Sequence, residues 1–293
     1  MVRRMIGAAL VVLGLALAVP AQARPLKVVT TFSLLAGMVE TVAGPAAEVQ
    51  ALVGPDGDAH VFEPSPSHVK AVSEADLVIG NGLGFEPWLD RLVESAGARG
   101  KLVLATSGIT PRREEDGAID PHAWQDLANG RRYVAAIAQA LSAAAPEQAA
   151  GIAERATLYE QKLQELDGWV RGQIATLPPE RRQIITSHDA FGYFGQAYGI
   201  TLIAAQGLST EAEPTGRDVA RLVRQIKKDK VRAVFLENMS DPRLIRTLAR
   251  DAGAVVGGTL YADALSPPDG PAPTYEAMIR HNVSVLVAAM SRN

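Results

Sequence analysis

Residues 146–177 read PEQAAGIAERATLYEQKLQELDGWVRGQIATL. Apolar side chains recur in this segment at every third or fourth position, and they are Ile152, Ala156, Tyr159, Leu163, Leu166, Val170, Ile174 and Leu177. That spacing predicts one long amphipathic helix with a single buried stripe. Pro146 fits the first turn of such a helix, and Pro178-Pro179 ends it. A helix of this length spans roughly 46 Å at about 1.5 Å per residue, so it can hold two lobes at a nearly fixed distance.

Short apolar runs alternate with helical patterns on both sides of this helix. Before it, the predicted strands are residues 26–30, 49–53, 76–79 and 102–105, and the predicted helices include 33–43, 67–75 and 87–96. After it, the predicted strands are 183–186, 201–204, 233–237 and 255–260, and the predicted helices include 190–198, 216–228, 242–251 and 274–290. Such alternation is typical of βαβ units with a parallel sheet.

The sequence therefore predicts an α/β fold with two lobes, each with a mainly parallel four-stranded sheet flanked by helices. Residues 24–145 form the N-terminal lobe and residues 178–293 form the C-terminal lobe. One long rigid helix at 146–177 joins them, where a flexible linker would leave them free to move. We expect the lobes to meet elsewhere only across a cleft.

The first 23 residues have the pattern of a secretory signal peptide. Arg3 and Arg4 precede a 14-residue apolar run at 6–19, and Ala21-Gln22-Ala23 is a cleavage site. Fourteen residues fall short of the roughly 20 that span a bilayer, which argues against a membrane anchor. We expect cleavage after Ala23, export to the periplasm and a mature chain with 27 basic and 32 acidic residues.

The composition narrows the class of protein. The chain has 293 residues, of which 47% are hydrophobic, so it can bury a sizeable core. Its formal charge is −3, which gives no basic excess for nucleic-acid binding. The sequence contains no cysteine. Neither a cysteine ligand nor a cysteine nucleophile is therefore available, and we expect the mature protein to be free of a lipid anchor and soluble.

Three of the five histidines follow predicted parallel strands. His60 comes after strand 49–53, His122 after strand 102–105 and His188 after strand 183–186, while Asp263 follows strand 255–260. In open α/β sheets, ligands bind in the crevice at the carboxyl ends of the strands. Three imidazoles and one carboxylate suit a four-coordinate divalent ion, although spacing alone leaves ordinary loop roles open. The other two histidines, His68 and His281, lie on predicted helices, where we expect structural or solvent-exposed roles.

Three motifs carry a resemblance to a known family. Residues 57–66 read GDAHVFEPSP, residues 120–124 read DPHAW and residues 188–194 read HDAFGYF. These resemble the zinc/manganese solute-binding proteins of ABC importers, and the similarity extends over nearly the whole mature chain. It implies that His60, His122, His188 and Asp263 are the metal ligands. For Asp263 the likeness rests on the weaker motif YADALS at 261–266.

The resemblance also implies the function. A periplasmic, non-enzymatic protein of this family holds Zn²⁺, or alternatively Mn²⁺, in the cleft between two metal-binding lobes and delivers it to the membrane permease of an ABC importer. We expect a monomer, and a periplasmic zinc chaperone is a further candidate partner.

Two departures from the family pattern bear on the metal. Many zinc-specific members carry a long histidine-rich loop before the second motif, whereas segment 111–119 here is short and has no histidine. An accessory role of that loop in scavenging metal is therefore not expected. Members thought to carry manganese often have a glutamate where this chain has His188, which favours zinc.

Several acidic residues lie near the proposed ligands. Asp58, Asp120 and Asp189 can accept the second ring N–H of a ligand histidine, or they can end strands and cap helices. Glu63 and Glu237 can also support the ligand side chains, although we favour ordinary loop and strand-end roles for both. The loop 207–215, which contains Glu211 and Glu213, can guard the cleft.

Two other functions stay open at this point. A secreted zinc-dependent hydrolase would use three protein ligands and keep one position open for water. A metal-binding adhesin could use the same fold, because fold does not dictate function. A metal-free hydrolase built on Ser187-His188-Asp189 is disfavoured, since adjacent residues of an extended strand point to opposite faces.

Overall fold

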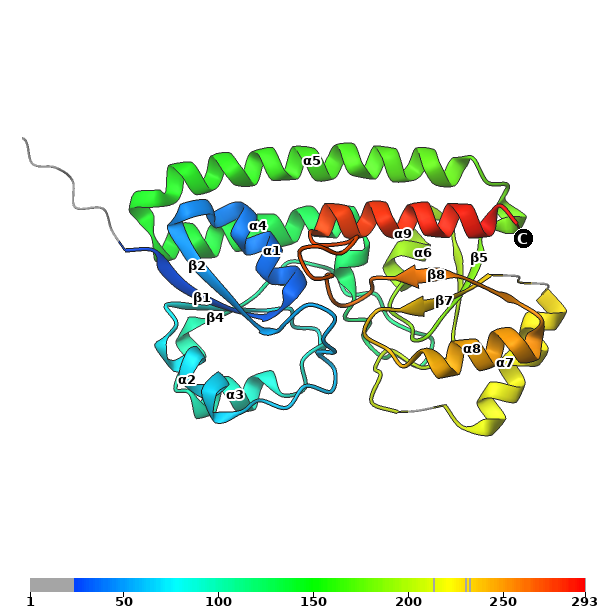
Figure 1. The fold of residues 1–293 in the computed structure, drawn as a ribbon. Coiled ribbons are helices and arrows are strands. Elements are labelled where there is room, and N and C mark those ends of the chain that lie inside the picture. Colours follow the sequence, from blue (N-terminus) through cyan, green and yellow to red (C-terminus); the bar gives the residue numbers. More distant parts are fainter. Residues whose placement is uncertain (1–23, 213, 230, 232, 293) are drawn as a thin grey trace, which may run out of the picture.

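The computed structural model describes residues 24–292 except 213, 230 and 232. The predicted signal peptide lies outside the described residues. Two four-stranded parallel sheets lie side by side, with helices above and below them in the view of Figure 1. This arrangement confirms the predicted fold class.

The first sheet has the strand order β2-β1-β3-β4, and all its strands are parallel. The strands are β1 (Leu26–Phe32), β2 (Ala47–Val53), β3 (Leu77–Gly80) and β4 (Leu102–Leu104). Three helices connect them, namely α1 (Ser33–Ala43), α2 (Pro66–Glu74) and α3 (Leu89–Ser95). Short 3₁₀ turns add η1 (Gly44–Ala46) and η2 (Arg99–Lys101). β1 and β3 are buried almost throughout, as expected for central parallel strands with both faces covered.

The second sheet repeats this plan with the order β6-β5-β7-β8, again all parallel. Its strands are β5 (Gln183–Thr186), β6 (Thr201–Ala204), β7 (Ala233–Glu237) and β8 (Val255–Leu260). The helices are α6 (Gly192–Tyr198), α7 (Gly216–Asp229) and α8 (Pro242–Ala252). One 3₁₀ turn, η5 (Pro179–Arg181), precedes β5. In Figure 1 the arrowheads of β7 and β8 point toward the first sheet. The carboxyl ends of the second sheet therefore face the first lobe.

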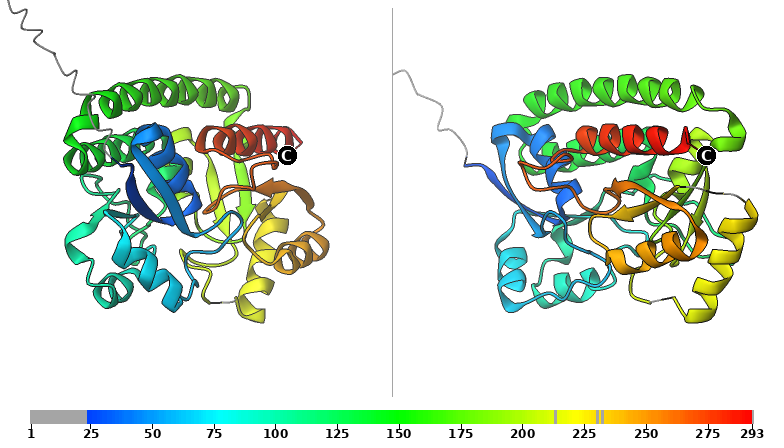
Figure 2. Two further views of the ribbon diagram at one scale, coloured as in Figure 1. Left: turned by 60° about the vertical axis from the view of Figure 1, so that its left-hand side comes forward. Right: turned by 45° about the vertical axis from the view of Figure 1, so that its right-hand side comes forward.

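Three helices form a layer that covers both sheets. They are α4 (Leu127–Ala144), α5 (Ala149–Ala175) and α9 (Tyr275–Met290). Figures 1 and 2 show α5 lying over α4 and α9, on the side away from α2, α3, α7 and α8. The seven side chains of α5 that are buried are those of the predicted stripe from Ile152 to Ile174. The predicted helix is slightly too long, because η4 (Pro146–Gln148) precedes α5 as a 3₁₀ turn and α5 ends at Ala175.

Helix α4 was not among the predicted helices. Its buried residues Leu127, Val134, Ile137 and Leu141 recur at helical spacing. The Asp126 side chain accepts a hydrogen bond from Ala128 N, which is an N-cap. The signals for this helix are therefore present in the sequence.

The expectation that the lobes meet only across a cleft and along one helix is wrong. One continuous hydrophobic core includes residues of both sheets and of α1, α4, α5 and α9. Hydrogen bonds also cross between the lobes, as when Leu265 N donates to Ser33 Oγ at 3.0 Å. The two sheets are thus parts of one packed body. Within the described residues, no helix has the length and hydropathy needed to cross a membrane.

Candidate metal centre

Four side chains converge between the facing carboxyl ends of the two sheets. They lie in the segments that follow β2, β4, β5 and β8, and they are His60, His122, His188 and Asp263. One nitrogen or oxygen atom from each lies within 4.8 Å of the others. These four are the ligand set implied by the family resemblance. The structure brings them together, and that they bind an ion stays a prediction.

The distances among these groups suit a four-coordinate ion. His60 Nε2 lies 3.3 Å from both His122 Nε2 and Asp263 Oδ2, and His188 Nε2 lies 3.0 Å from Asp263 Oδ2. In a tetrahedral site with bonds of about 2.0–2.1 Å, neighbouring ligand atoms lie about 3.3 Å apart. Three nitrogens and one oxygen can therefore surround an ion with little rearrangement.

The cluster is closed off from solvent. His122, His188 and Asp263 are 0% exposed, and His60 is 5% exposed. Both carboxylate oxygens of Asp263 and Nε2 of His188 make no hydrogen bond to any part of the chain that the structure describes. Buried polar atoms without partners are costly, so a cation between them would satisfy an otherwise unfavourable arrangement.

His60 is held by a tight loop after β2. Gly57 N donates to Gly54 O at 3.2 Å, and a Cβ on Gly57 would lie 2.7 Å from the Val53 side chain, so glycine is required there. Trp88 Nε1 donates to Ala59 O at 2.7 Å, next to the ligand. The His60 ring packs edge-on against Phe85, with ring centroids 4.7 Å apart. These contacts fix the loop that presents the imidazole.

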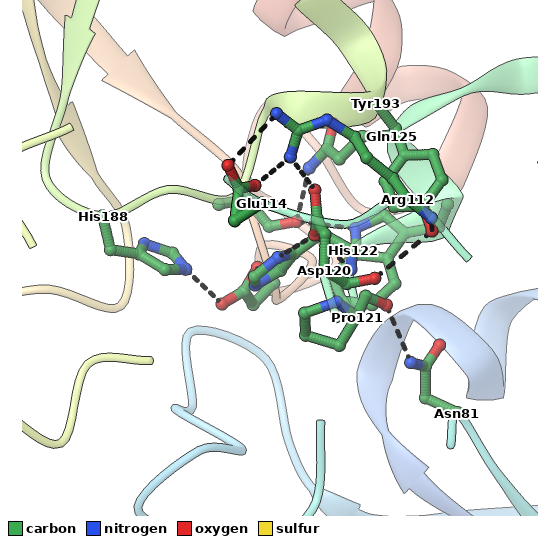
Figure 3. Close-up of polar contacts among 12 residues, drawn as sticks. Asn81, Arg112, Glu114, Asp120, Pro121, His122, Gln125, His188 and Tyr193 are labelled. Atoms are coloured by element: carbon green, nitrogen blue, oxygen red, sulfur yellow. Dashed lines mark hydrogen bonds and ion pairs between the residues drawn. The ribbon is translucent and has the colours of Figure 1, made fainter. Parts of the chain in front are cut away.

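His122 is oriented by Asp120, one of the three aspartates considered for this role. His122 Nδ1 lies 2.8 Å from Asp120 Oδ1, and Arg112 Nη1 donates to the other carboxylate oxygen at 2.9 Å. Figure 3 shows this chain of contacts from Arg112 through Asp120 to His122. Because the carboxylate accepts from Nδ1, Nε2 is left to face the cluster. Asn81 Nδ2 holds the same loop by donating to Pro121 O at 2.9 Å.

His188 is oriented by Glu237, so the less favoured of the two roles considered for Glu237 is the one observed. His188 Nδ1 is hydrogen-bonded to Glu237 Oε2. Glu237 Oε1 accepts from the backbone N–H groups of Ser187 and His188 at 2.8 and 3.1 Å. The sequence did not favour this role because the two residues are 49 positions apart and meet only through the β5–β7 pairing. The neighbouring Asp189 has no such contact with the ring.

The electrostatics of the metal-free site follow from this arrangement. Burial alone would lower the pKa of His188, but the carboxylates of Glu237 and Asp263 outweigh burial and raise that pKa well above 6.5. Burial would raise the pKa of Asp263, but His188 and His122 outweigh it and hold that pKa well below 3.8. In the metal-free protein a positive imidazolium therefore faces a carboxylate, and a bound cation would replace the proton.

Asp263 is fixed by both lobes. Trp124 Nε1 and Gln125 Nε2, which follow His122 on η3 (Ala123–Gln125), both donate to Ala262 O at 2.9 Å. Asn282 on α9 exchanges two hydrogen bonds with the backbone of Tyr261, at 2.9 and 2.7 Å. Sequence reasoning missed these supports. A buried asparagine within the apolar stripe of α9 is the signal that could have indicated one of them.

The remaining candidates lie outside the cluster. His68 Nδ1 accepts from Ser65 N at 2.9 Å as part of the cap of α2, and His281 Nε2 lies 2.9 Å from Thr259 O. These contacts fit the structural roles that we expected for both histidines.

The other acidic residues do not contact the ligand rings. Asp58 accepts a hydrogen bond from the backbone of His60, not from its ring. Glu63 and Glu211 are exposed, and Glu213 lies outside the described residues.

Several known metal-binding proteins are similar to this chain over most of its length. Residues 28–289 match the family described as "Zinc-uptake complex component A periplasmic". The manganese-binding lipoprotein MntA of Halalkalibacterium halodurans is 37% identical over 268 residues, which cover 91% of this chain and 89% of MntA. The zinc-binding protein TroA of Treponema pallidum is 33% identical over 282 residues, covering 93% of this chain and 91% of TroA.

Solved structures show the same fold. The structure of periplasmic zinc-binding TroA superimposes with a TM-score of 0.87 at 31% identity, covering 91% of this chain and 99% of TroA. A cadmium-bound periplasmic metal-binding protein from Candidatus Liberibacter asiaticus superimposes with a TM-score of 0.81 at 26% identity, covering 90% of this chain and 99% of that protein. The chain therefore belongs to the family of the periplasmic component A of the zinc-uptake complex.

Proposed function

We propose that the mature chain captures Zn²⁺ in the periplasm through His60, His122, His188 and Asp263 and delivers it to the permease of an ABC importer. The observation that carries this proposal is the buried cluster of three imidazoles and one carboxylate, in which three polar atoms lack hydrogen-bond partners among the described residues. Without a cation the cluster depends on the His188–Asp263 ion pair, and a bound cation would satisfy all four groups. Relatives named zinc-binding, manganese-binding and metal ABC transporter substrate-binding proteins support the transport role.

The choice of metal follows from the donor set. Imidazole nitrogens suit zinc, and manganese lies at the weak end of the divalent affinity series. Manganese is the alternative, since relatives such as MntA are named for it. Elemental analysis of protein purified without added metal, followed by competition at equimolar Zn²⁺ and Mn²⁺, decides between them. Retention of Mn²⁺ against Zn²⁺ would reverse the choice of metal and leave the transport role standing.

Ligand variants test the site itself. We expect one tightly bound Zn²⁺ per chain, measured against a chromogenic chelator. His60→Ala and His188→Ala should each abolish tight binding, because each removes one of four ligands. His68→Ala and His281→Ala are matched controls that should still bind one ion, since neither ring faces the cluster. Loss of binding in the controls alone would show that the site has been misplaced.

Delivery to an importer has its own test. Deleting the gene should slow growth under zinc starvation, and zinc-loaded protein should stimulate the ATPase of its importer in proteoliposomes. An adhesin would leave both unchanged.

We further propose a monomer that is free of lipid, because the sequence contains no cysteine, whereas MntA is named a lipoprotein. Lipid labelling of the expressed protein tests this difference, and a zinc chaperone would be sought by its transfer of zinc to the metal-free chain.

A hydrolase is the less supported alternative. It would need an open coordination position for water and a general base beside the ion. The proposed site offers four protein groups and is closed to solvent. A coordination count of three protein ligands plus water, measured by X-ray absorption on the zinc-loaded protein, would favour the enzyme.

A further inference from the structure

The loop that carries His60 has one residue in a strained backbone conformation and is hydrogen-bonded to the C-terminal lobe. Asp56 has a φ of 55°, in the left-handed region that non-glycine residues seldom adopt. Two contacts with the other lobe stabilise it. Asp56 N donates to Leu265 O at 3.0 Å, and Asn238 Nδ2 donates to Asp56 Oδ1 at 2.8 Å. The conformation of this N-terminal-lobe loop thus depends on the C-terminal lobe.

Asp58 makes a third link and connects it directly to a proposed ligand. Its Oδ1 accepts from His60 N at 2.9 Å, and its Oδ2 accepts from Thr210 Oγ1 at 2.7 Å. Thr210 belongs to the loop between β6 and α7. One carboxylate therefore fixes the backbone of His60 with one oxygen and holds the opposite lobe with the other.

Because the proposed site is buried, the release of an ion depends on which segment around it can move. An ion bound among groups that are 0–5% exposed cannot leave unless some segment around it moves. His122 and Asp263 are poor candidates for that movement, because Trp124 and Gln125 bond the His122 segment to the Asp263 segment. The loop of His60 is attached to the C-terminal lobe through one backbone hydrogen bond and two side-chain hydrogen bonds, so it can separate at a smaller cost.

We propose that Asp58 and Thr210 are a positioning pair that keeps His60 on the bound ion and so slows its release. This inference rests on the proposed function. Without the ion, three imidazoles and one carboxylate are buried together with the His188–Asp263 ion pair as their main polar contact, an arrangement that disfavours a closed site. The pair therefore forms after the ion has entered. Its loss should accelerate release and leave the rate of uptake unchanged.

Thr210→Val tests the pair, because it keeps the shape of the side chain and removes the hydroxyl. The release rate of Zn²⁺ from the loaded full-length protein is measured by stopped flow into excess EDTA, and the uptake rate is measured separately with Zn²⁺. A hydrogen bond to a carboxylate is worth enough to expect about tenfold faster release. Thr210→Ser restores the hydroxyl and should restore slow release.

Thr215→Val is the matched control on the same loop. The Thr215 hydroxyl donates to Asp218 within its own lobe, so its loss should leave release unchanged. Asp58→Ala should accelerate release at least as much as Thr210→Val, and adding Thr210→Val to it should give no further change. The melting temperature of the metal-free protein should be the same in Thr210→Val and the wild type.

Each outcome has a distinct meaning. Unchanged release in Thr210→Val would overturn the positioning pair while the proposed function stands. Acceleration of uptake and release by the same factor would also overturn it, because the pair would then be closed without the ion. Failure of the wild-type chain to bind Zn²⁺ would instead overturn the proposed function.

Discussion

Two of the three ligand imidazoles share their second nitrogen with a carboxylate. Asp120 is hydrogen-bonded to Nδ1 of His122, and Glu237 is hydrogen-bonded to Nδ1 of His188. Both carboxylates are buried. Such a partner fixes the ring orientation and makes the coordinating nitrogen more basic. The partners differ in their own surroundings, since Asp120 is paired with Arg112 and Glu237 accepts two backbone N–H groups. Residues outside the four-residue cluster thus set the orientation of two of its rings.

The Glu237–His188 contact leads to a pH prediction. The raised pKa of His188 means that the metal-free protein holds a proton near neutral pH, which Zn²⁺ must displace. Zinc affinity should therefore fall as the pH is lowered, with about one proton released per ion near pH 7. Glu237→Gln removes a charge that raises this pKa, so fewer protons should be released and affinity should drop about 10–100-fold. Calorimetry in two buffers of different ionisation enthalpy measures the protons.

Glu63→Gln is the control for this experiment, because Glu63 is exposed and has no contact with a ligand ring in the described structure. Equal proton release by Glu237→Gln and the wild type would show that Glu237 does not govern the protonation of His188.

At the scale of elements, the long helix α5 packs against both lobes. Seven of its side chains enter the core, from Ile152 near its start to Ile174 near its end. Arg155 adds a polar attachment by donating to Val42 O and Ala43 O at the end of α1. A helix attached along its whole length resists wide separation of the lobes, so motion of the small loops is the cheaper way to open the site.

Leu163→Ala tests the contribution of this stripe. Leu163 is 0% exposed in the middle of α5, so truncation should leave a cavity and cost about 2–5 kcal/mol of unfolding free energy. Leu158 on the same helix is 51% exposed, and Leu158→Ala should change stability by less than about 0.5 kcal/mol. Urea unfolding of the metal-free protein measures both. Equal losses would mean that the stripe does not hold the lobes.

The elements were largely predictable from the sequence, and their tertiary connections were not. All eight strands begin within two residues of the predicted positions, because buried parallel strands are short apolar runs with clear ends. The convergence of His60, His122 and His188 could be predicted because loops after such strands share one crevice. The sequence could not assign supporting roles to Glu237, Gln125 and Asn282, because their partners lie far away in the sequence. A contact between a side chain and a distant loop leaves no periodic pattern. The shared core of the lobes likewise depends on how the two sheets pack.

At the scale of the whole molecule, this shared core changes what the ion has to do. In two independent lobes, an ion between them would be the main link. Here Phe32, Trp124 and Tyr275 are buried in a core that also contains Phe235 of the second sheet. Tyr275 OH donates to Trp124 O and so joins α9 to the segment of His122. The segments of His122 and Asp263 are therefore held in place before an ion arrives, and binding needs ordering mainly of the His60 loop.

This packing predicts how the molecule unfolds. Because the main core includes residues of both sheets, the metal-free protein should melt in one cooperative transition, with calorimetric and van't Hoff enthalpies in agreement. Zinc at a thousandfold excess over its Kd should stabilise the folded state by about 4 kcal/mol, which corresponds to a rise of roughly 10 °C in melting temperature. His188→Ala should remove most of that rise and keep the single transition, since His188 adds a ligand but little apolar packing. Differential scanning calorimetry with and without zinc tests both statements. Two separate transitions in the metal-free protein, merging only when zinc is added, would mean that the ion and not the core unites the lobes.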